Sequence, residues 1–345
     1  MTPSSASVAD FIFQCAVVII GIVGAAANAL VLYAMIVSKQ HKKQLLIFNQ
    51  NMFDLCSCLF LVVIYILKLC SIHLTGTLGY WLCTMLLSEN LLWWSVNGSV
   101  INLLSIATER YLKVVHSSIS KKVLRKWVIY SAMAFPWISA TIYNMTVVFL
   151  TTRVIDGVCY GYVFWESRLA SAVYGTWHFV SFFVVVLIGF IYCYGRILAV
   201  IRRQANVMAA HSGTGSTTTQ VHTNHARVNV TKTMILVCAF YVRSNLPDRM
   251  YYLLLNLGVM NLTLSESAYY LIVFISFLYI CTNPFIYATK FDPVRRVLLR
   301  LIVCRKSSGQ PAAGEETPGT RTISVRPAPQ HNRLNLTDTN MMKHH

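Results

Sequence analysis

Long hydrophobic stretches alternate with short polar ones along most of this chain. Seven of the stretches reach the length of about 20 residues at which an α-helix crosses the hydrocarbon core of a membrane. Their approximate limits are 11–37, 45–69, 82–108, 127–150, 170–195, 231–256 and 267–289. The polar connections leave no room for a separate soluble domain. The pattern therefore predicts an all-α membrane protein, built as a bundle of seven transmembrane helices.

The charge distribution predicts how the chain crosses the membrane. Charged residues make up only 12% of the 345 residues, against about 25% in an average soluble domain. The net charge of +17 gathers in alternate connections and after the seventh stretch. Cytoplasmic loops carry such an excess of Lys and Arg, so we expect the N-terminus outside the plasma membrane and the C-terminus in the cytoplasm. The basic residues then face the lipid bilayer, and nucleic acid is not an expected partner.

A shorter segment after the seventh stretch is amphipathic. In FDPVRRVLLRLIVCRK, Val294, Val297 and Leu301 recur at helical spacing against three arginines, which predicts an eighth helix on the cytoplasmic membrane surface. The tail is rich in Pro, Gly, Ser and Thr, a composition typical of disorder. The predicted organisation is an extracellular N-terminus over 1–10, a seven-helix domain over 11–291, the surface helix over 292–306 and a disordered cytoplasmic tail over 307–345.

Several residues outside the hydrophobic stretches are candidates for covalent modification. Cys83 lies at the outer end of the third stretch and Cys159 in the outer loop DGVCYGY. Both face an oxidising compartment, so we predict a disulfide between them. Asn261, in the tripeptide NLT of the last outer loop, is a predicted glycosylation site. Cys304, at the end of the surface helix, is a predicted palmitoylation site.

Polar side chains recur inside the predicted membrane helices. Asn28, Asp54, Ser99, Asn102 and Asn283 each lie within a hydrophobic stretch. Such residues are costly in a membrane and often mark functional sites. The alternative is that each one only hydrogen-bonds a neighbouring helix. That alternative suits a single residue better than a set spread over four helices.

The motifs around these residues resemble those of the rhodopsin-like G-protein-coupled receptors, over about residues 11–305. One motif falls in each stretch, in order, and the wording is most like that of invertebrate receptors. The matching residues are Asn28 in NALVLY, Asp54 in FDL, Glu109, Arg110 and Tyr111 in TERYLKVVH, Trp137, Tyr194 in CYGRIL, Pro247 in SNLP, and Asn283, Pro284 and Tyr287 in NPFIY. In this family the Cys of the third helix usually lies two residues nearer the Arg than Cys83 does.

The resemblance implies a mechanism for the activation switch. Glu109 would hold the Arg110 guanidinium at rest, and an outward movement of the sixth helix would free Arg110 to meet a heterotrimeric G protein. The other residues implied in coupling and activation are Tyr111, Tyr194, Asn283, Pro284 and Tyr287. Arrestin and receptor kinases are further implied partners. Asp54, Ser99 and Asn283 resemble the family's sodium pocket, where the ion favours the inactive state; no other cofactor is expected.

The inner end of the sixth helix departs from many relatives. Counting back from Pro247, Arg227 takes the position of an acid that pairs with the Arg of the third helix in those receptors. The surrounding stretch VHTNHARVNVTK contains no Asp or Glu. Glu109 is then the partner of Arg110 that the sequence makes visible. We therefore predict appreciable basal signalling without ligand.

Two classes of ligand, amines and retinal, do not fit the sequence. Leu92 stands where amine receptors carry an Asp, and Phe277 stands where opsins carry the retinal-binding Lys. The remaining candidates in the outer half of the bundle are aromatic or charged with either sign, apart from one amide. They are Trp93, Trp177, His178, Asn245, Asp248, Arg249, Tyr252 and Tyr269. This mixture favours a peptide ligand, and a small non-amine molecule or a lipid is the alternative. Arg243, Asp248 and Arg249 either pair among themselves or reach water, or else Asp248 or Arg249 binds a charged group of the ligand.

Functions of other classes fit the sequence less well. A channel or transporter is the second alternative, but the seven stretches do not divide into the repeated halves that many transporters show. The catalytic motifs His-Glu-x-x-His and Gly-x-Ser-x-Gly are absent from the sequence, and an enzyme is not expected.

Overall fold

The computed structural model describes residues 8–162, 164–210, 218–259, 266–290 and 292–307, and within these it describes no side chains over 205–230, 266–267, 289–290, 292–293 and 302–307. Residues 1–304 form one compact unit and residues 305–345 a second. Asn261 and the predicted disordered tail lie outside the described residues, and so do the side chains of Arg227 and Cys304. Their predicted roles stay predictions.

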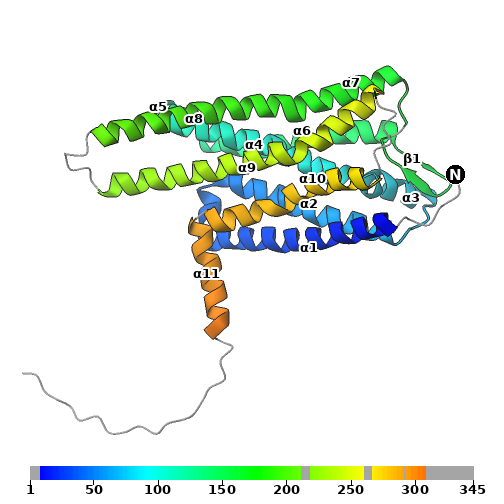
Figure 1. Ribbon diagram of the computed structural model, residues 1–345, viewed down its shortest axis with the longest axis horizontal. Helices are drawn as coiled ribbons and strands as arrows, with labels where there is room; N and C mark the ends of the chain where they lie inside the picture. The colour runs from blue at the N-terminus through cyan, green and yellow to red at the C-terminus, as the bar shows by residue number, and fades with distance from the viewer. Residues whose placement is uncertain (1–7, 163, 211–217, 260–265, 291, 308–345) are drawn as a thin grey trace, which may run out of the picture. The chain divides into compact units, whose positions relative to one another are not determined.

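Every hydrophobic stretch that the sequence predicts lies in helical structure, so the seven-helix bundle is confirmed (Figure 1). The elements in chain order are α1 (Val8–Val37), η1 (Gln40–Lys42), α2 (Leu45–Leu69), α3 (Gly76–Leu82), η2 (Cys83–Leu87), α4 (Asn90–Val115), α5 (Ser117–Val123), α6 (Lys126–Thr151), β1 (Arg153–Ile155), β2 (Val158–Tyr160), α7 (Arg168–Phe179), η3 (Val180–Val184), α8 (Val185–Ala210), α9 (Thr218–Leu257), α10 (Glu266–Lys290) and α11 (Asp292–Ser307).

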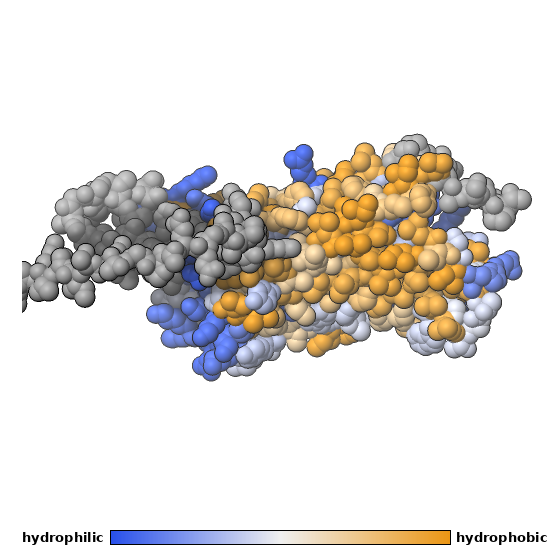
Figure 2. All heavy atoms as spheres, turned by 90° about the horizontal axis from the view of Figure 1, so that it is seen from below, coloured by the Kyte–Doolittle hydropathy of each residue, from blue (hydrophilic) through white to orange (hydrophobic). Residues whose placement is uncertain are grey.

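Six helical segments in the described part of the chain are long and apolar enough to cross a membrane. The seventh helix of the bundle is α9, which carries Arg243, Asp248 and Arg249 within its length. On the face drawn in Figure 2, hydrophobic side chains cover most of the bundle, and many of the hydrophilic ones gather toward its ends. This distribution suits a protein whose middle part is surrounded by lipid.

The bundle packs around α4. This helix contacts α2, α6 and α8, while α1 packs on α2 and α10, and α9 packs on α7 and α10. Gly98 lets α2 and α4 approach closely, because a Cβ there would lie 2.3 Å from Cε1 of Phe53. The Phe53 ring stacks on Trp137 with 3.8 Å between the ring centroids. The family-like residue Trp137 thus joins α6 to α2, and its Nε1 donates to Asn49 Oδ1 at 3.0 Å.

Two π-helical turns, η2 and η3, interrupt the helices. In η3, Tyr241 Oη of α9 donates to the backbone carbonyl of Phe182 at 2.6 Å. A side chain that inserts into the backbone ladder is a common cause of such a distortion. The sequence pattern did not predict this π-helical turn, because the segment contains no proline that would mark a distortion of the helix. The turn matters for the site because it lies two residues after His178.

A short hairpin lies at the same end of the bundle as the start of α1 and the end of α9 (Figure 1). Its strands β1 and β2 pair antiparallel, with Val154 opposite Cys159. The connecting residues Asp156 and Gly157 both have positive φ, at 50° and 74°. This is the two-residue turn that the dipeptide Asp-Gly favours. The backbone carbonyl of Gly157 accepts from Leu74 N at 3.0 Å, which fastens the turn to the loop after α2.

Candidate functional site

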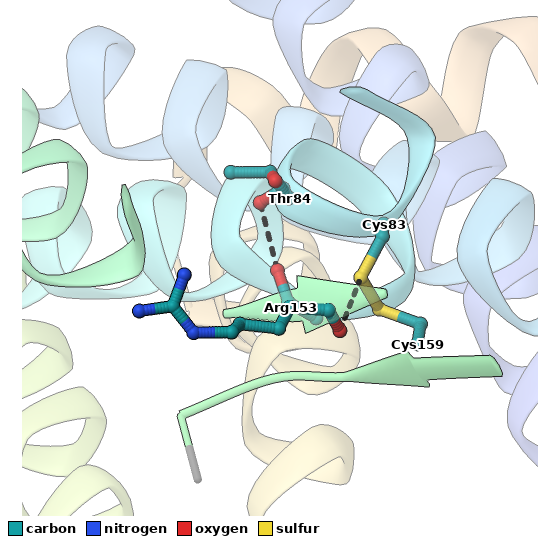
Figure 3. The surroundings of a disulfide bond; sticks show 5 residues. Cys83, Thr84, Arg153 and Cys159 are labelled. Atoms are coloured by element: carbon teal, nitrogen blue, oxygen red, sulfur yellow. Dashed lines mark hydrogen bonds between the residues drawn. A yellow bond between two sulfur atoms is a disulfide. The ribbon is translucent and has the colours of Figure 1, made fainter. Parts of the chain in front are cut away.

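The predicted disulfide is present. Cys83 of η2 and Cys159 of β2 are bonded, with their Cα atoms 5.3 Å apart (Figure 3). The π-helical turn explains why Cys83 lies farther from Arg110 than in the family, since such a turn accommodates an extra residue in the helix. The helix is interrupted again at Glu89, where φ is 61°. The bond therefore fastens the hairpin to the start of α4.

Cys83→Ser, Cys159→Ser and the double variant are expected to lose most of the receptor at the cell surface, and all three to the same extent. Breaking the bond releases the hairpin from α4, and the loss of a native disulfide commonly costs about 2–5 kcal/mol. Flow cytometry of an N-terminal epitope tag measures the effect. Cys70→Ser is the matched control, because Cys70 is free and exposed. A double variant that reaches the surface like the wild type would contradict this role of the bond.

A cavity of about 370 Å³ opens in the bundle next to the disulfide. This volume lies within the range of about 300–1,000 Å³ that is typical of ligand pockets. The lining residues come from α4, α6, α7, α9, α10 and the loop after β2. They include six of the predicted ligand-binding residues, namely Trp93, His178, Asp248, Arg249, Tyr252 and Tyr269. The structure thus brings these six residues together around one cavity.

Two of the predicted ligand-binding residues do not line the cavity. Trp177 is 59% exposed and lies on the outer face of α7. Successive helical residues point about 100° apart, so Trp177 faces outward because its neighbour His178 faces inward. Asn245 is buried one turn below the cavity, where its Nδ2 donates to the Tyr241 carbonyl at 3.1 Å.

Arg249 lies at the base of a chain of side chains in this cavity. Its Nη1 donates to His178 Nε2. His178 Nδ1 lies 2.8 Å from Tyr143 Oη, to which it donates when Nε2 accepts. The Trp93 ring lies 5.3 Å from the Arg249 guanidinium carbon. Arg249 is only 2% exposed, yet its Nε and Nη2 have no hydrogen-bond partner among the described residues. Tyr143 was not among the predicted site residues.

The alternative in which Asp248 and Arg249 pair with each other is wrong for the described structure. No ion pair within 4.0 Å joins the two side chains, although they are neighbours in α9. The other acid of the cavity, Glu89, is engaged by Lys68 at 2.5 Å and by Tyr65 at 3.1 Å. Asp248 and Arg249 therefore both line the cavity without a direct ion pair, although their charges still interact at longer range.

A second polar group lies in the middle of the bundle, around Asp54. Asp54 Oδ2 accepts from Asn283 Nδ2 at 3.0 Å. Its Oδ1 accepts from Ser99 Oγ at 3.1 Å and from Gln50 Nε2 at 3.2 Å. Gln50 Nε2 also donates to Ser99 Oγ, and Gln50 Oε1 accepts from Asn102 at 2.9 Å. The structure brings the three predicted residues together and adds Gln50, which the sequence analysis did not include.

The oxygens around Asp54 are of the kind that a sodium ion takes as ligands. They belong to Asp54, Ser99 and Asn283, and Asn283 Oδ1 has no hydrogen-bond partner among the described residues. The Gln50 amide contacts both Asp54 and Ser99, so an ion would have to displace it. Gln50 precedes Asp54 by four residues, and this spacing on a helix is the pattern from which the contact could have been predicted.

The third polar group surrounds Arg110, near the end of α4. Arg110 is 8% exposed, and its Nη2 lies 3.3 Å from Glu109 Oε2. The same nitrogen donates to Gln44 Oε1, at the start of α2. Lys113 binds the other Glu109 oxygen at 2.5 Å. The Glu109–Arg110 pair is as the sequence predicted, and Gln44 is a partner that it did not predict.

A cavity of about 630 Å³ opens beside Arg110. Gln44, Lys113, Ser117 and Thr231 are among its other lining residues, so that α4, α5, α9 and the residue before α2 all border it. The remaining predicted switch residues do not line it. Tyr194 and Tyr287 are buried, and Tyr111 Oη lies 3.0 Å from His116 Nε2.

Comparison with known proteins agrees with this architecture. The family described as 7 transmembrane receptor (rhodopsin family) matches residues 27–287. This range begins before Asn28 and ends at Tyr287, so it contains all three polar groups described above. No curated protein matches the chain.

Proposed function

The chain belongs to the rhodopsin family of seven-transmembrane receptors, and we propose that it converts the binding of an extracellular peptide into activation of a heterotrimeric G protein. Membership makes it a multi-pass membrane receptor that signals through G proteins. The peptide ligand and the mechanism below are our proposals. The observation that supports them most strongly is the presence of a cavity near each end of α4.

The two cavities lie far apart along one helix. Trp93 lines the cavity beside the disulfide and Arg110 the other. At 1.5 Å per helical residue they are separated by roughly 25 Å. Helix α9 also borders both cavities, through Arg249 at one and Thr231 at the other. A ligand that binds one position of α9 more tightly than another would increase the fraction of receptors in that position. The same movement of α9 would change the distant cavity.

The proposed coupling step is the release of Arg110. At rest its guanidinium is held by Glu109 and Gln44, neither of which belongs to α9. Movement of α9 would enlarge the cavity beside Arg110 and admit the C-terminal helix of the G protein α subunit. Arg110 would then exchange its resting acceptors for acceptors on the partner. Arginine suits this role because it is always charged and presents five donors.

The lining of the cavity beside the disulfide supports a peptide ligand. It combines tyrosines with one unpaired acid and one unpaired base. A sterol or a neutral lipid would leave both charges unpaired, which is unfavourable. A small non-amine molecule with complementary polar groups fits the same cavity and is the alternative.

A tissue extract separates these alternatives. Membranes that contain the full chain and added G protein are treated with extract fractions, and GTPγS binding is measured. We expect the active fraction to be aqueous and to lose its activity after protease digestion. Activity that survives digestion would favour a small molecule, and activity in the organic phase a lipid. Currents across a bilayer without any G-protein response would instead favour a channel.

Localisation in the plasma membrane, with the N-terminus outside, is part of the proposal. The hairpin and its disulfide would then lie on the extracellular side, and Arg110 on the cytoplasmic side. Asn261 would carry a glycan, whereas Asn335, in a matching tripeptide, would not. Glycosidase treatment should change the mobility of the wild type but not of Asn261→Gln. A glycan at Asn335 would contradict the orientation.

Regulation by arrestin and receptor kinases and palmitoylation of Cys304 are also proposed. The supporting sequence features are the Ser and Thr clusters of the third cytoplasmic loop and the tail. A phosphate adds about −1.5 to −2 charge at neutral pH, which changes the surface offered to a partner. Alanine at all of these positions should abolish arrestin recruitment, and recruitment that persists would contradict the proposal. If Cys304→Ser incorporates a palmitate analogue as well as the wild type does, Cys304 is not the palmitoylation site.

Basal nucleotide exchange in the wild type is expected to be the same in NaCl and in choline chloride. The reason is that the Gln50 amide already occupies the contacts to Asp54 and Ser99 that a sodium ion would need. Gln50→Leu should free these oxygens, so that NaCl lowers its basal exchange. The double variant Gln50→Leu/Asp54→Asn lacks the carboxylate and should lose this response. A wild type that is inhibited by NaCl as strongly as Gln50→Leu would contradict the proposal.

A further inference from the structure

Arg249 has hydrogen-bond donors that no described residue uses. Its Nε and Nη2 are buried without an acceptor, while Nη1 donates to His178. A buried charged donor without a partner is more costly than a neutral one. Arg249 is one of the residues that line the cavity beside the disulfide. A group that enters the cavity is therefore in a position to accept these hydrogen bonds.

Among the described residues no carboxylate lies within ion-pair distance of this guanidinium, and the neighbouring Asp248 interacts with it only at longer range. Glu89 is already bound by Lys68 and Tyr65. Asp248 forms no ion pair with Arg249, because neighbouring helical residues point about 100° apart. His178 accepts from Arg249 through Nε2, so its ring is neutral and supplies no negative charge to the guanidinium.

The surroundings hold the guanidinium in a fixed orientation. Trp93 lies against it, with its ring 5.3 Å from the guanidinium carbon, as in cation–π contacts. Tyr143 fixes His178 from the opposite ring nitrogen at 2.8 Å. A planar guanidinium held in this way favours planar acceptors that take two parallel hydrogen bonds, above all a carboxylate.

We infer that the ligand carries a carboxylate, which binds Nε and Nη2 of Arg249, and a cationic group, which faces the unpaired Asp248. The inference rests on the proposed function in one respect, that this cavity is the ligand site. An amphoteric ligand of this kind is either a peptide that enters with a free carboxyl end or a small amino acid derivative. Sterols, neutral lipids and peptides without a carboxylate are excluded as ligands.

Matched pairs of small probes test the carboxylate without knowledge of the natural ligand. The full chain is purified in detergent, and its thermal unfolding midpoint is measured with sodium benzoate or with benzamide plus NaCl at equal ionic strength. Benzoate should raise the midpoint by about 2 °C more than benzamide at a concentration several times its Kd. Pools of tripeptides that end in a carboxylate or a carboxamide form the second pair. A larger difference for the tripeptides than for benzoate indicates a peptide, and the reverse indicates a small acid.

Variants of α9 locate the effect. Arg249→Gln should abolish the difference within each pair, while Arg243→Gln should leave it unchanged, because Arg243 is exposed and does not line the cavity. If Arg249→Gln does not fold, Arg249→Lys decides, since it keeps the charge but loses the planar fork and should give a smaller difference. Asp248→Asn should weaken the binding of tripeptides that end in a carboxylate but not the binding of benzoate.

Equal midpoints for both members of both pairs in the wild type would overturn the inference. Differences that persist in Arg249→Gln, or that are undiminished in Arg249→Lys, would also overturn it. Nucleotide exchange on added G protein is measured with the same preparations. A benzoate effect without any nucleotide exchange would leave the carboxylate site standing and contradict the proposed function, whereas exchange without a benzoate effect would do the opposite.

Discussion

Replacing Arg110 with glutamine is expected to lower ligand-stimulated nucleotide exchange by roughly 30-fold or more. In the proposed coupling step the Arg110 guanidinium binds acceptors of the G protein inside the cavity that it lines. Truncating one partner of a buried, hydrogen-bonded charge pair at an interface costs about 2 kcal/mol or more, and that free energy corresponds to roughly 30-fold in affinity. Glutamine keeps hydrogen-bonding atoms but removes the charge and the planar fork.

GTPγS binding to membranes measures this loss, with the peptide-containing extract fraction as the stimulus and receptor number normalised by surface epitope. Lys122→Gln is the matched control, because it removes the same charge from an exposed position that does not line the cavity. The control should retain the wild-type rate. An Arg110→Gln variant that also retains it would place the G-protein contact elsewhere.

Replacing Glu109 with glutamine is expected to raise basal exchange about fivefold. The Glu109 carboxylate lies 3.3 Å from Arg110, and its side chain is only 6% exposed. Loss of about 1 kcal/mol of resting stabilisation changes a two-state equilibrium about fivefold. Gln44→Leu removes the second acceptor of Arg110 and should act in the same direction. The effects of the two variants need not add, because both act on one side chain.

Exchange without ligand, measured at equal surface expression, tests this prediction. Lys122→Gln is the control, since Lys122 is exposed and does not line the cavity beside Arg110. Arg227→Glu would supply α9 with the acid that the sequence lacks there and should lower basal exchange. A wild type without basal exchange, together with an inactive Glu109→Gln variant, would show that other contacts keep α9 in its resting position.

The parts of the structure that depend on local pattern could be predicted from the sequence. Hydrophobic length predicted the helices, and the position of two cysteines on the outer side of the membrane predicted the disulfide. The Asp156–Gly157 dipeptide indicates a two-residue hairpin, although the hairpin was not predicted. The hairpin could have been predicted from this dipeptide, which lies in a short outer loop.

The contacts that join distant segments could not be predicted in the same way. Gln44 precedes α2, and nothing in its neighbourhood indicates that its amide meets a guanidinium 66 residues later. Trp177 was a candidate because it is an aromatic residue in the outer half of the bundle, and only the orientation of α7 shows that it faces outward. The use of His178 by both Arg249 and Tyr143 likewise depends on how three helices pack.

The most direct test uses the purified full chain in lipid nanodiscs, with purified heterotrimeric G protein and no other component, and measures the rate of GDP release. The wild type should accelerate release above the spontaneous rate even without ligand, and further when the active extract fraction is added. Arg110→Gln in the same nanodiscs should leave the spontaneous rate unchanged. Release that is no faster with the wild type under either condition, or equally fast with Arg110→Gln, would contradict signalling through the Arg110 cavity.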